Sequence, residues 1–339
     1  VRWSDVDRYV GALDALARTV PPDAPWTAPD ADALDTLTLD RWLAAEVPDA
    51  DVRHQLEVVL TELMCVPADE LSLLTLLHAG VTSGSLAGAL GVEDGAQERR
   101  VVHGIQAAAR ALADELGDRV RLGTGVDRLS WNADGAIVDL ADGPVMARHA
   151  VVAMAPSSCE RIDFEPVLPL RRVDAQRRMP LGSVIKVCAV YDRPFWREAG
   201  LSGSVLDLDG PFHHCLDVSS PDSGAGVLVS FLAADDARGL SDQALGSGAS
   251  DVRRTRFLEC AERWFGPEAA QPRHYRDLDW SSVPSVGGGY SGVVEPGAWA
   301  EIGPSLTAPA GCLHWAGSES SSTWTGYVEG AIASGVRAA

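Results

Sequence analysis

The stretch from His314 to Ile332 constrains the fold more than any other part of the chain. A strand-like run leads into Gly317-Ser318-Glu319, and a second glycine, Gly326, precedes a helix-like run. The first N–H groups of a helix have no partner within the helix, so this helix start can face an anion or an electron-rich carbonyl group. A glycine hinge that merely starts a helix has the same pattern, so the motif alone leaves both interpretations open.

Lysine is almost absent from the sequence. Of the 28 basic residues only Lys186 is a lysine, and it stands in an apolar run with Val184, Ile185 and Val187. Arginine stays charged, whereas the pKa of a lysine falls when its ammonium group is desolvated. We therefore expect Lys186 to hold a water molecule or to share a proton. A lysine whose stem extends from a strand edge toward water is the alternative.

Composition excludes several classes of function. The 339 residues are 46% hydrophobic, which suffices for a large core and two domains. The net charge of −20 argues against nucleic acids and anionic membranes as partners. Six cysteines without a C-x-x-C pair indicate reduced thiols and a cytoplasmic protein. No apolar run reaches the roughly 20 residues that span a bilayer.

The first 90 residues have the apolar spacing of helices. One helical pattern covers 6–20 and is stopped by Pro21-Pro22. Further helical patterns are predicted over 38–43, 52–65 and 70–77.

Near residue 101 the pattern changes. An alanine-rich amphipathic helix is predicted over 105–116, and turn signals such as Asp142-Gly143 separate the strand-like runs that follow it. These runs cover 120–122, 126–131, 136–140 and 147–153. The pattern predicts a β-meander after a helix. Later helices are expected over 251–264 and 327–338, and the irregular alternation favours a mixed α/β fold with two interwoven domains.

Several blocks of the sequence resemble the flavin-dependent amine oxidases of the monoamine oxidase family. The segment from His314 to Ile332 is similar to the C-terminal motif of that family, and Gly182-Ser183-Val184-Ile185-Lys186 is similar to a second block. Smaller matches lie elsewhere, so that the resemblance extends over essentially the whole chain: Tyr191, Pro194-Phe195-Trp196, Asp23-Ala24-Pro25-Trp26, Gln97-Glu98-Arg99 and Leu116-Gly117-Asp118-Arg119-Val120.

The resemblance implies an FAD-binding domain of the glutathione-reductase and amine-oxidase type, interleaved with a mixed-sheet and helical substrate domain. On that basis residues 1–100 form the helical part of the substrate domain and residues 101–175 a part of the FAD domain with the β-meander. Residues 176–281 form the sheet and helix of the substrate domain, and residues 282–339 the C-terminal FAD-binding part.

The family pattern also implies roles for three residues. Lys186 matches a lysine that holds a water molecule against the flavin N5. Tyr290 and Tyr327 match an aromatic cage through which the amine reaches the flavin, since aromatic faces attract an ammonium group. Ordinary aromatic packing is the alternative for both tyrosines.

The cofactor implied by the resemblance is FAD, bound without a covalent link. Gly289 occupies the position where the mitochondrial monoamine oxidases carry the cysteine that is joined to the flavin, and glycine has no sulfur. Val328 is expected to direct its N–H toward the flavin O2. The cofactor-binding positions carried over are Val126, Trp280, Gly317, Ser318, Glu319, Gly326, Tyr327 and Val328. No metal is expected.

The implied activity is oxidation of a small amine to an imine, which hydrolyses to an aldehyde while oxygen becomes hydrogen peroxide. The oligomeric state stays open, with a homodimer as one option. An amino-acid or polyamine oxidase of the same superfamily and a non-catalytic remnant are the alternatives. Positions that match the family's substrate cavity, with plain packing as their alternative, are Met64, Cys65, Leu90, Gln97 and His214.

One element of the family pattern is missing from the sequence. The N-terminal βαβ unit with its glycine fingerprint, which holds the FAD pyrophosphate in the family, is not found, and the first residues already resemble the helical substrate region. We therefore expect a fragment that exposes apolar strand edges, binds FAD poorly and is inactive by itself, whereas the complete parent protein is an enzyme. Amine-dependent peroxide formation by the isolated chain would contradict this expectation.

Overall fold

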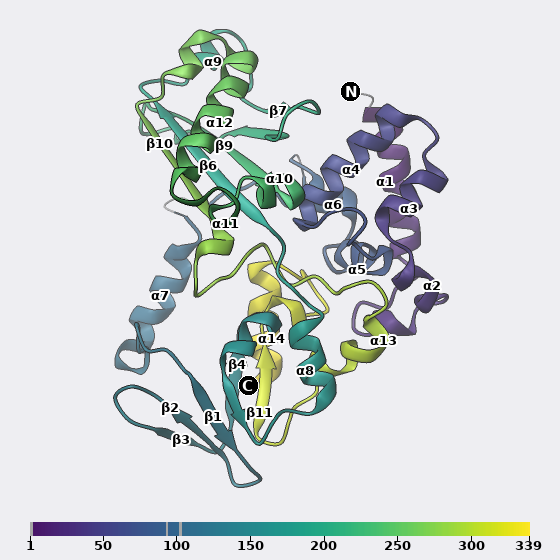
Figure 1. The fold of residues 1–339 in the computed structure, drawn as a ribbon, viewed down its shortest axis with the longest axis vertical. Helices are drawn as coiled ribbons and strands as arrows, with labels where there is room; N and C mark the ends of the chain where they lie inside the picture. Colours follow the sequence, from purple (N-terminus) through teal and green to yellow (C-terminus); the bar gives the residue numbers. More distant parts are fainter. Residues whose placement is uncertain (1–2, 93, 102–103) are drawn as a thin grey trace. The chain divides into compact units, whose positions relative to one another are not determined.

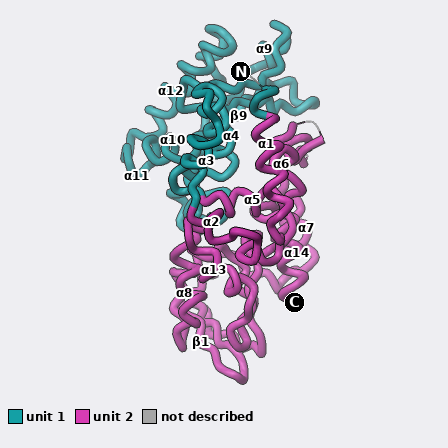
Figure 2. The backbone as a smooth tube through the Cα atoms, turned by 90° about the vertical axis from the view of Figure 1, so that its right-hand side faces the viewer, with its two compact units in different colours: residues 1–6, 37–71, 181–293 teal, residues 7–36, 72–180, 294–339 magenta. Residues whose placement is uncertain are grey.

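A computed structural model describes residues 3–92, 94–101 and 104–339 (Figure 1). The chain divides into two compact units, coloured separately in Figure 2. Unit 1 comprises residues 1–6, 37–71 and 181–293, and unit 2 comprises residues 7–36, 72–180 and 294–339. Each unit is thus assembled from three separate stretches of the chain. The four-part division suggested by the family resemblance stays a prediction.

Unit 1 is built around a five-stranded antiparallel sheet in the order β10-β6-β9-β8-β7. Its strands are β6 (Val184–Tyr191), β7 (Val205–Leu206), β8 (His214–Asp217), β9 (Gly226–Ala233) and β10 (His274–Asp279). Its helices are α3 (Leu39–Glu46), α4 (Ala50–Met64), α9 (Phe195–Glu198), α10 (Ala234–Gly239), α11 (Asp242–Leu245) and α12 (Ala249–Phe265).

The long helix α12 covers one face of this sheet (Figure 1). Ile185, Val187 and Ala189 alternate along β6 and are fully buried in one cluster with Phe257 and Ala261 of α12. Because successive side chains of a strand point to opposite faces, the intervening residues of β6 lie on the other face. Lys186 is therefore on the face away from α12.

Helix α4 begins and ends at sites that the sequence specifies. Asp49 caps its start by accepting hydrogen bonds from the Asp51 and Val52 N–H groups at 3.1 and 3.2 Å. Cys65 ends it in the left-handed region with φ of 56°, and the Cys65 carbonyl oxygen accepts a hydrogen bond from the Ser183 N–H at 2.8 Å. This bond ties the end of α4 to the residue just before β6.

Unit 2 combines helices with two small sheets. Its helices are α1 (Trp3–Ala17, which starts in unit 1), α2 (Ala31–Thr36), α5 (Leu73–Thr82), α6 (Leu86–Leu90), α7 (Gln106–Leu116), α8 (Leu170–Arg177), α13 (Trp299–Ile302) and α14 (Val328–Ala338). Its strands are β1 (Arg128–Trp131), β2 (Ala136–Asp139), β3 (Val145–Ala147), β4 (Ala150–Ala153), β5 (Asp163–Glu165) and β11 (Leu313–Ala316).

The predicted meander is confirmed as the antiparallel run β1-β2-β3, and β5 joins it parallel to β1. Strands β4 and β11 form a separate parallel pair, with Trp315 opposite Val152. Both sheets share a core that includes Leu129, Phe164 and Leu313. The carboxyl end of β11 runs directly into Gly317, so the glycine turn lies at the carboxyl edge of a parallel pair.

Two predicted strands are wrong. Residues 120–122 form no strand, and Leu122 is 88% exposed, because the run is too short to bury its apolar side chain. The strand predicted over 147–153 is two strands: β3 ends at Ala147 and β4 begins at Ala150, in a different sheet. The predicted helix over 70–77 starts later, at Leu73, where Ser72 accepts a hydrogen bond from the Thr75 N–H at 3.3 Å.

All six cysteines are free thiols, as predicted, and five of them are buried. In the described part of the chain, every helix is too short or too polar to cross a lipid bilayer.

Candidate active site

Lys186 is exposed on the open face of the unit 1 sheet, between two neighbours in register. It pairs with Phe231 of β9 on one side and Leu278 of β10 on the other. The Lys186 Nζ lies 5.6 Å from the centroid of the Phe231 ring, within the range of a cation–π contact. The ammonium group is thus held over an aromatic ring and still open to a ligand.

Tyr290 lies at the same ring. Its ring centroid is 6.3 Å from that of Phe231, with the planes at 75°, and 55% of Tyr290 is exposed. An edge-to-face contact is a favourable arrangement of two aromatic rings, and Tyr290 is the more exposed of the two. Unit 1 therefore brings together Lys186, Phe231 and Tyr290.

Two glycines let the segments of this site approach each other closely. A Cβ on Gly182 would lie 2.5 Å from the Gly289 carbonyl oxygen and 2.7 Å from the Cys65 Cβ. The Gly289 N–H donates to the Gly182 carbonyl oxygen at 2.9 Å. Glycine at position 182 therefore allows Cys65, the start of β6 and the segment before Tyr290 to meet.

The predicted cavity residues Cys65 and Met64 lie at the end of α4. Cys65 is completely buried and packs with Val184, Ala233 and the partly buried Trp280. Burial raises the pKa of the Cys65 thiol to about 12, so it is protonated at neutral pH and acts as an apolar wall. Met64 is half-buried at the last position of the helix.

His214 stands on the same sheet face as Lys186. Leu216, two residues after His214, pairs with Val229, and Val229 pairs with Cys188, two residues after Lys186. Paired residues share a face of the sheet, and so do residues two apart along a strand. The His214 Nδ1 contacts the Glu62 carboxylate of α4. Burial lowers the pKa of His214 to about 4, so the ring is neutral at neutral pH and donates its Nδ1–H to Glu62.

In unit 2 the predicted turn follows β11. Gly317 has φ of +133° and its N–H donates to the Ser334 Oγ of α14 at 2.9 Å. Arg337, also of α14, donates from Nη2 to the Trp315 carbonyl oxygen at 2.7 Å and contacts the Ser320 carbonyl oxygen. The helix thereby clamps both ends of the turn that contains Ser318 and the buried Glu319.

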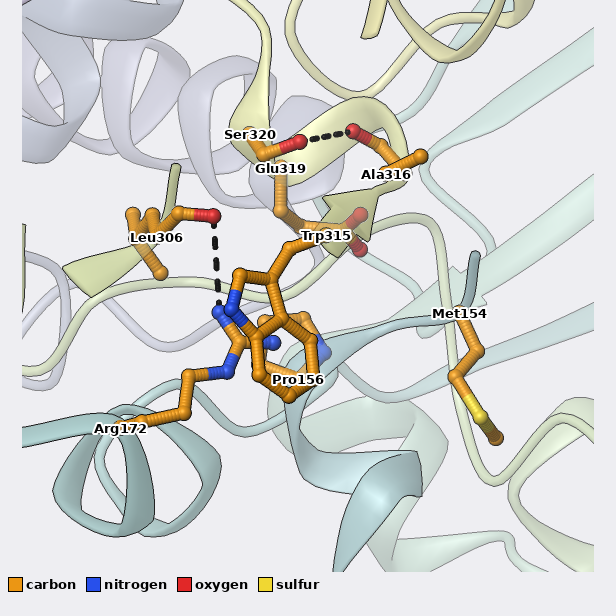
Figure 3. Close-up of a pocket in the computed structure, with 9 residues that line it drawn as sticks. Met154, Pro156, Arg172, Leu306, Trp315, Ala316, Glu319 and Ser320 are labelled. Atoms are coloured by element: carbon orange, nitrogen blue, oxygen red, sulfur yellow. Dashed lines mark hydrogen bonds between the residues drawn. The ribbon is translucent and has the colours of Figure 1, made fainter. Parts of the chain in front are cut away.

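Arg172 lies beneath this turn and was not predicted from the sequence (Figure 3). It is 4% exposed, its guanidinium carbon lies 3.8 Å from the Trp315 ring centroid, and Nη1 donates to the Ser305 carbonyl oxygen at 3.3 Å. The Arg172 Nε and the Trp315 Nε1 are buried without a hydrogen-bond partner. The cavity that both residues line has about 10 Å³, enough for one water molecule.

No side chain of the N-cap residue caps the first N–H groups of α14. Tyr327 is its N-cap residue and makes no side-chain capping bond, and Gly326 before it has φ of +84°. Trp324 holds the Tyr327 ring edge-on at a centroid distance of 5.1 Å, and burial raises the pKa of the tyrosine. Val328, the first residue of the helix, is 52% exposed.

The other predicted residues lie elsewhere in unit 2. Leu90 is half-buried at the end of α6. Gln97 is exposed and its Nε2 donates to the Ala89 carbonyl oxygen at 3.3 Å, so it is bound back to α6. Val126 is half-buried in the segment before β1. The predicted site residues are thus distributed over both units, with Tyr290 in unit 1 and Tyr327 in unit 2.

The model of the family described as flavin containing amine oxidoreductase matches residues 13–339 of this chain. The chain belongs to this family. It is 32% identical over 330 residues to a Dictyostelium discoideum protein named Probable flavin-containing monoamine oxidase A, covering 97% of this chain and 71% of that protein. It is 34% identical over 335 residues to the Mycobacterium tuberculosis protein named Putative flavin-containing monoamine oxidase AofH. This match covers 99% of this chain and 72% of that protein.

The fold of the family is confirmed as well. A putrescine oxidase structure with bound putrescine superimposes with a TM-score of 0.93 at 29% identity, covering 98% of this chain and 74% of that one. Membership of the flavin-containing amine oxidoreductases makes this protein an oxidoreductase and a flavoprotein that acts on small amines.

The residues around Gly317 fit part of a flavin dinucleotide. A glycine with positive φ at the carboxyl end of a parallel strand allows close backbone approach, and an uncapped helix start offers N–H donors to negative charge. In this flavoprotein the turn from Gly317 to Glu319 and the start of α14 are accordingly the elements suited to the cofactor.

Three residues near the candidate site were not predicted from the sequence. Phe231 is one of several apolar residues in β9, and only strand pairing places it beside Lys186. Arg172 is one of four arginines in α8 and the residue after it, and only its burial separates it from the others. Glu62 could have been noticed as an acidic residue among the predicted cavity positions at the end of α4.

Proposed function

We propose that this protein oxidises a primary or secondary amine with FAD as the electron acceptor and oxygen as the final oxidant. The amine loses two electrons and two protons and becomes an imine, which water converts to an aldehyde or ketone, and oxygen takes the same two electrons and two protons to form hydrogen peroxide. FAD supplies the two-electron chemistry. The observation that carries the proposal is the single lysine of the chain on an open sheet face beside Phe231 and Tyr290.

In this proposal Lys186 holds a water molecule or a proton at its Nζ. Its neighbours on the sheet, Phe231 and Leu278, offer no competing hydrogen-bond acceptor in their side chains. An ammonium group in that position can donate to water and leave the water available to the reacting centre. Tyr290 and Tyr327 orient the amine through their ring faces.

Tyr290 provides the experiment that tests this role. Replacing Tyr290 with leucine should lower kcat/KM for amines by roughly ten-fold, because a contact of about 0.5–2 kcal/mol between cation and ring is lost. Tyr290→Phe keeps the ring and should retain most of the activity. Steady-state peroxide formation measures both, and a Leu variant as active as the Phe variant would remove Tyr290 from the proposed amine path.

We propose further that the flavin is bound without a covalent link through position 289. Gly289 is buried, and a Cβ at this position would lie 2.6 Å from the Val184 Cγ1. A cysteine there would displace Val184, at a cost of about 1–3 kcal/mol for overpacking. Acid precipitation of the holoenzyme should therefore leave all of the flavin in the supernatant, measured by its visible absorbance. Flavin retained in the washed pellet would show a covalent link and contradict the proposal.

A further inference from the structure

Unit 2 contains a buried positive charge that the proposed oxidation of the amine does not use. Arg172 belongs to α8, is 4% exposed and lies beneath the turn from Gly317 to Ser320 (Figure 3). Its Nη1 donates to the carbonyl oxygens of Ser305 and Leu306 at 3.3 and 3.5 Å. Removing an arginine from water costs free energy that hydrogen bonds to neutral groups only partly offset, so a buried guanidinium calls for an anionic partner.

The guanidinium group is held in one orientation against Trp315. The guanidinium carbon lies 3.8 Å from the centroid of the indole ring. The Arg172 Nε and the Trp315 Nε1 are buried without a hydrogen-bond partner, and both residues line the small cavity under the turn. A water molecule in this cavity could accept from either donor but would bring no negative charge. The charge of Arg172 must therefore be balanced by another side chain.

Glu319 supplies that balance. Among the described residues that line the cavity, Arg172 is the one cation and Glu319, which is 7% exposed, is the one anion. Burial lowers the pKa of Arg172 to about 10, and the negative charge of Glu319 opposes this shift, so the arginine is charged at neutral pH. Burial raises the pKa of the neighbouring Cys159 thiol, which is therefore uncharged. Arg172 and Glu319 are thus the two opposite charges of one buried site.

The position of Glu319 makes this balance important for the cofactor. Gly317 allows close backbone approach, and the uncapped start of α14 offers N–H donors to negative charge. A carboxylate without a counter-charge in the same turn would repel a phosphate group, and such repulsion is strong where water is excluded. Arg337 also reaches the turn, but its guanidinium donates to oxygen atoms of Trp315 and Ser320.

We propose that Arg172 is a positioning residue for the cofactor, because its charge balances that of Glu319 and so lets the turn accept the anionic pyrophosphate of FAD. The inference rests on FAD as the cofactor, which belongs to the proposed function. In this arrangement Arg172 acts through Glu319 and has no contact with the reacting amine.

Titration of the apoprotein with FAD, followed by the change in flavin fluorescence, tests the charge balance. Arg172→Met should raise the dissociation constant of FAD about ten-fold, because it leaves the charge of Glu319 unopposed. The same substitution in a Glu319→Gln background should change the constant by less than about three-fold. A residue that only fills space would cause the same loss with or without the carboxylate, so equal effects in the two backgrounds would overturn the proposal.

Further variants keep the test decisive if Arg172→Met does not fold. The double variant Arg172→Met with Glu319→Gln buries no unpaired charge, and it should bind FAD within about three-fold of Glu319→Gln alone. Arg172→Lys keeps a positive charge without the planar contact to Trp315, and should bind FAD more tightly than Arg172→Met. The matched control is Arg171→Met at the exposed neighbouring position of α8, which should bind FAD like the wild type. Much weaker binding by the double variant than by Glu319→Gln would contradict the charge balance.

The wild type separates this inference from the proposed function. If it binds FAD and the effect of Arg172→Met is independent of Glu319, only the inference is wrong. If it does not bind FAD, the proposed function is wrong and the inference with it. FAD binding that shows the expected coupling, without reduction of the flavin by any amine, would instead overturn amine oxidation and support the role of Arg172.

Discussion

Replacing Lys186 with methionine is expected to slow flavin reduction or reoxidation by roughly 10²–10⁴-fold, the range for a positioned group that transfers protons. Methionine keeps the length and apolar stem of the side chain but cannot hold a proton or bind water at its end. Stopped-flow absorbance of the holoenzyme, first without oxygen and then on mixing with oxygen, measures the two steps separately.

The controls lie on the same sheet face. Lys186→Arg should not restore the rates, because the planar guanidinium cannot take the place of a compact ammonium group. Arg276 of β10 is exposed and pairs with Cys188 of β6. Arg276→Met therefore removes a positive charge close to Lys186 and should leave both rates near those of the wild type. Unchanged rates in Lys186→Met would remove the lysine from the mechanism.

Replacing Arg253 with methionine should lower the free energy of unfolding by about 3–5 kcal/mol. The Arg253 Nη2 lies 2.6 Å from the Asp277 Oδ1 and 2.9 Å from the Asp242 Oδ1, and the side chains of Arg253 and Asp277 are each 3% exposed. Loss of the guanidinium leaves a buried carboxylate on β10, the strand that borders β6. Urea unfolding followed by circular dichroism measures the change.

The same helix supplies the control for this stability prediction. Arg256→Met changes an arginine of α12 that is 62% exposed and should alter stability by less than about 0.5 kcal/mol. Combining Arg253→Met with Asp277→Leu should recover much of the loss, because both buried charges are then removed together. A single Arg253→Met variant as stable as Arg256→Met would show that the buried pair contributes little.

The sequence predicted those parts of the site that depend on local pattern. Gly317, Gly326 and the start of α14 follow from a strand, a turn and a helix within 20 residues or so, and no distant contact is needed to place them. Lys186 was conspicuous because of its residue type. The sequence did not predict its surroundings: apolar neighbours along the strand suggested enclosure, whereas strand alternation buries Ile185 and Val187 and leaves Lys186 exposed.

Residues that depend on pairing between distant segments could not be predicted. Phe231 meets Lys186 through strand register, Glu62 meets His214 across 152 residues, and Arg172 meets Trp315 by packing. None of these pairs has a periodic or short-range pattern in the sequence. The break between Ala147 and Ala150 was not predicted for a similar reason. Only the strands that β3 and β4 pair with show that the two strands belong to different sheets.

Anaerobic mixing of the holoenzyme with an amine tests the central claim most directly. We predict that the visible band of the oxidised flavin disappears with a rate that rises with amine concentration, and that oxygen then restores the band with one equivalent of peroxide. A flavin band that stays unchanged with both monoamines and diamines would contradict amine oxidation by this protein.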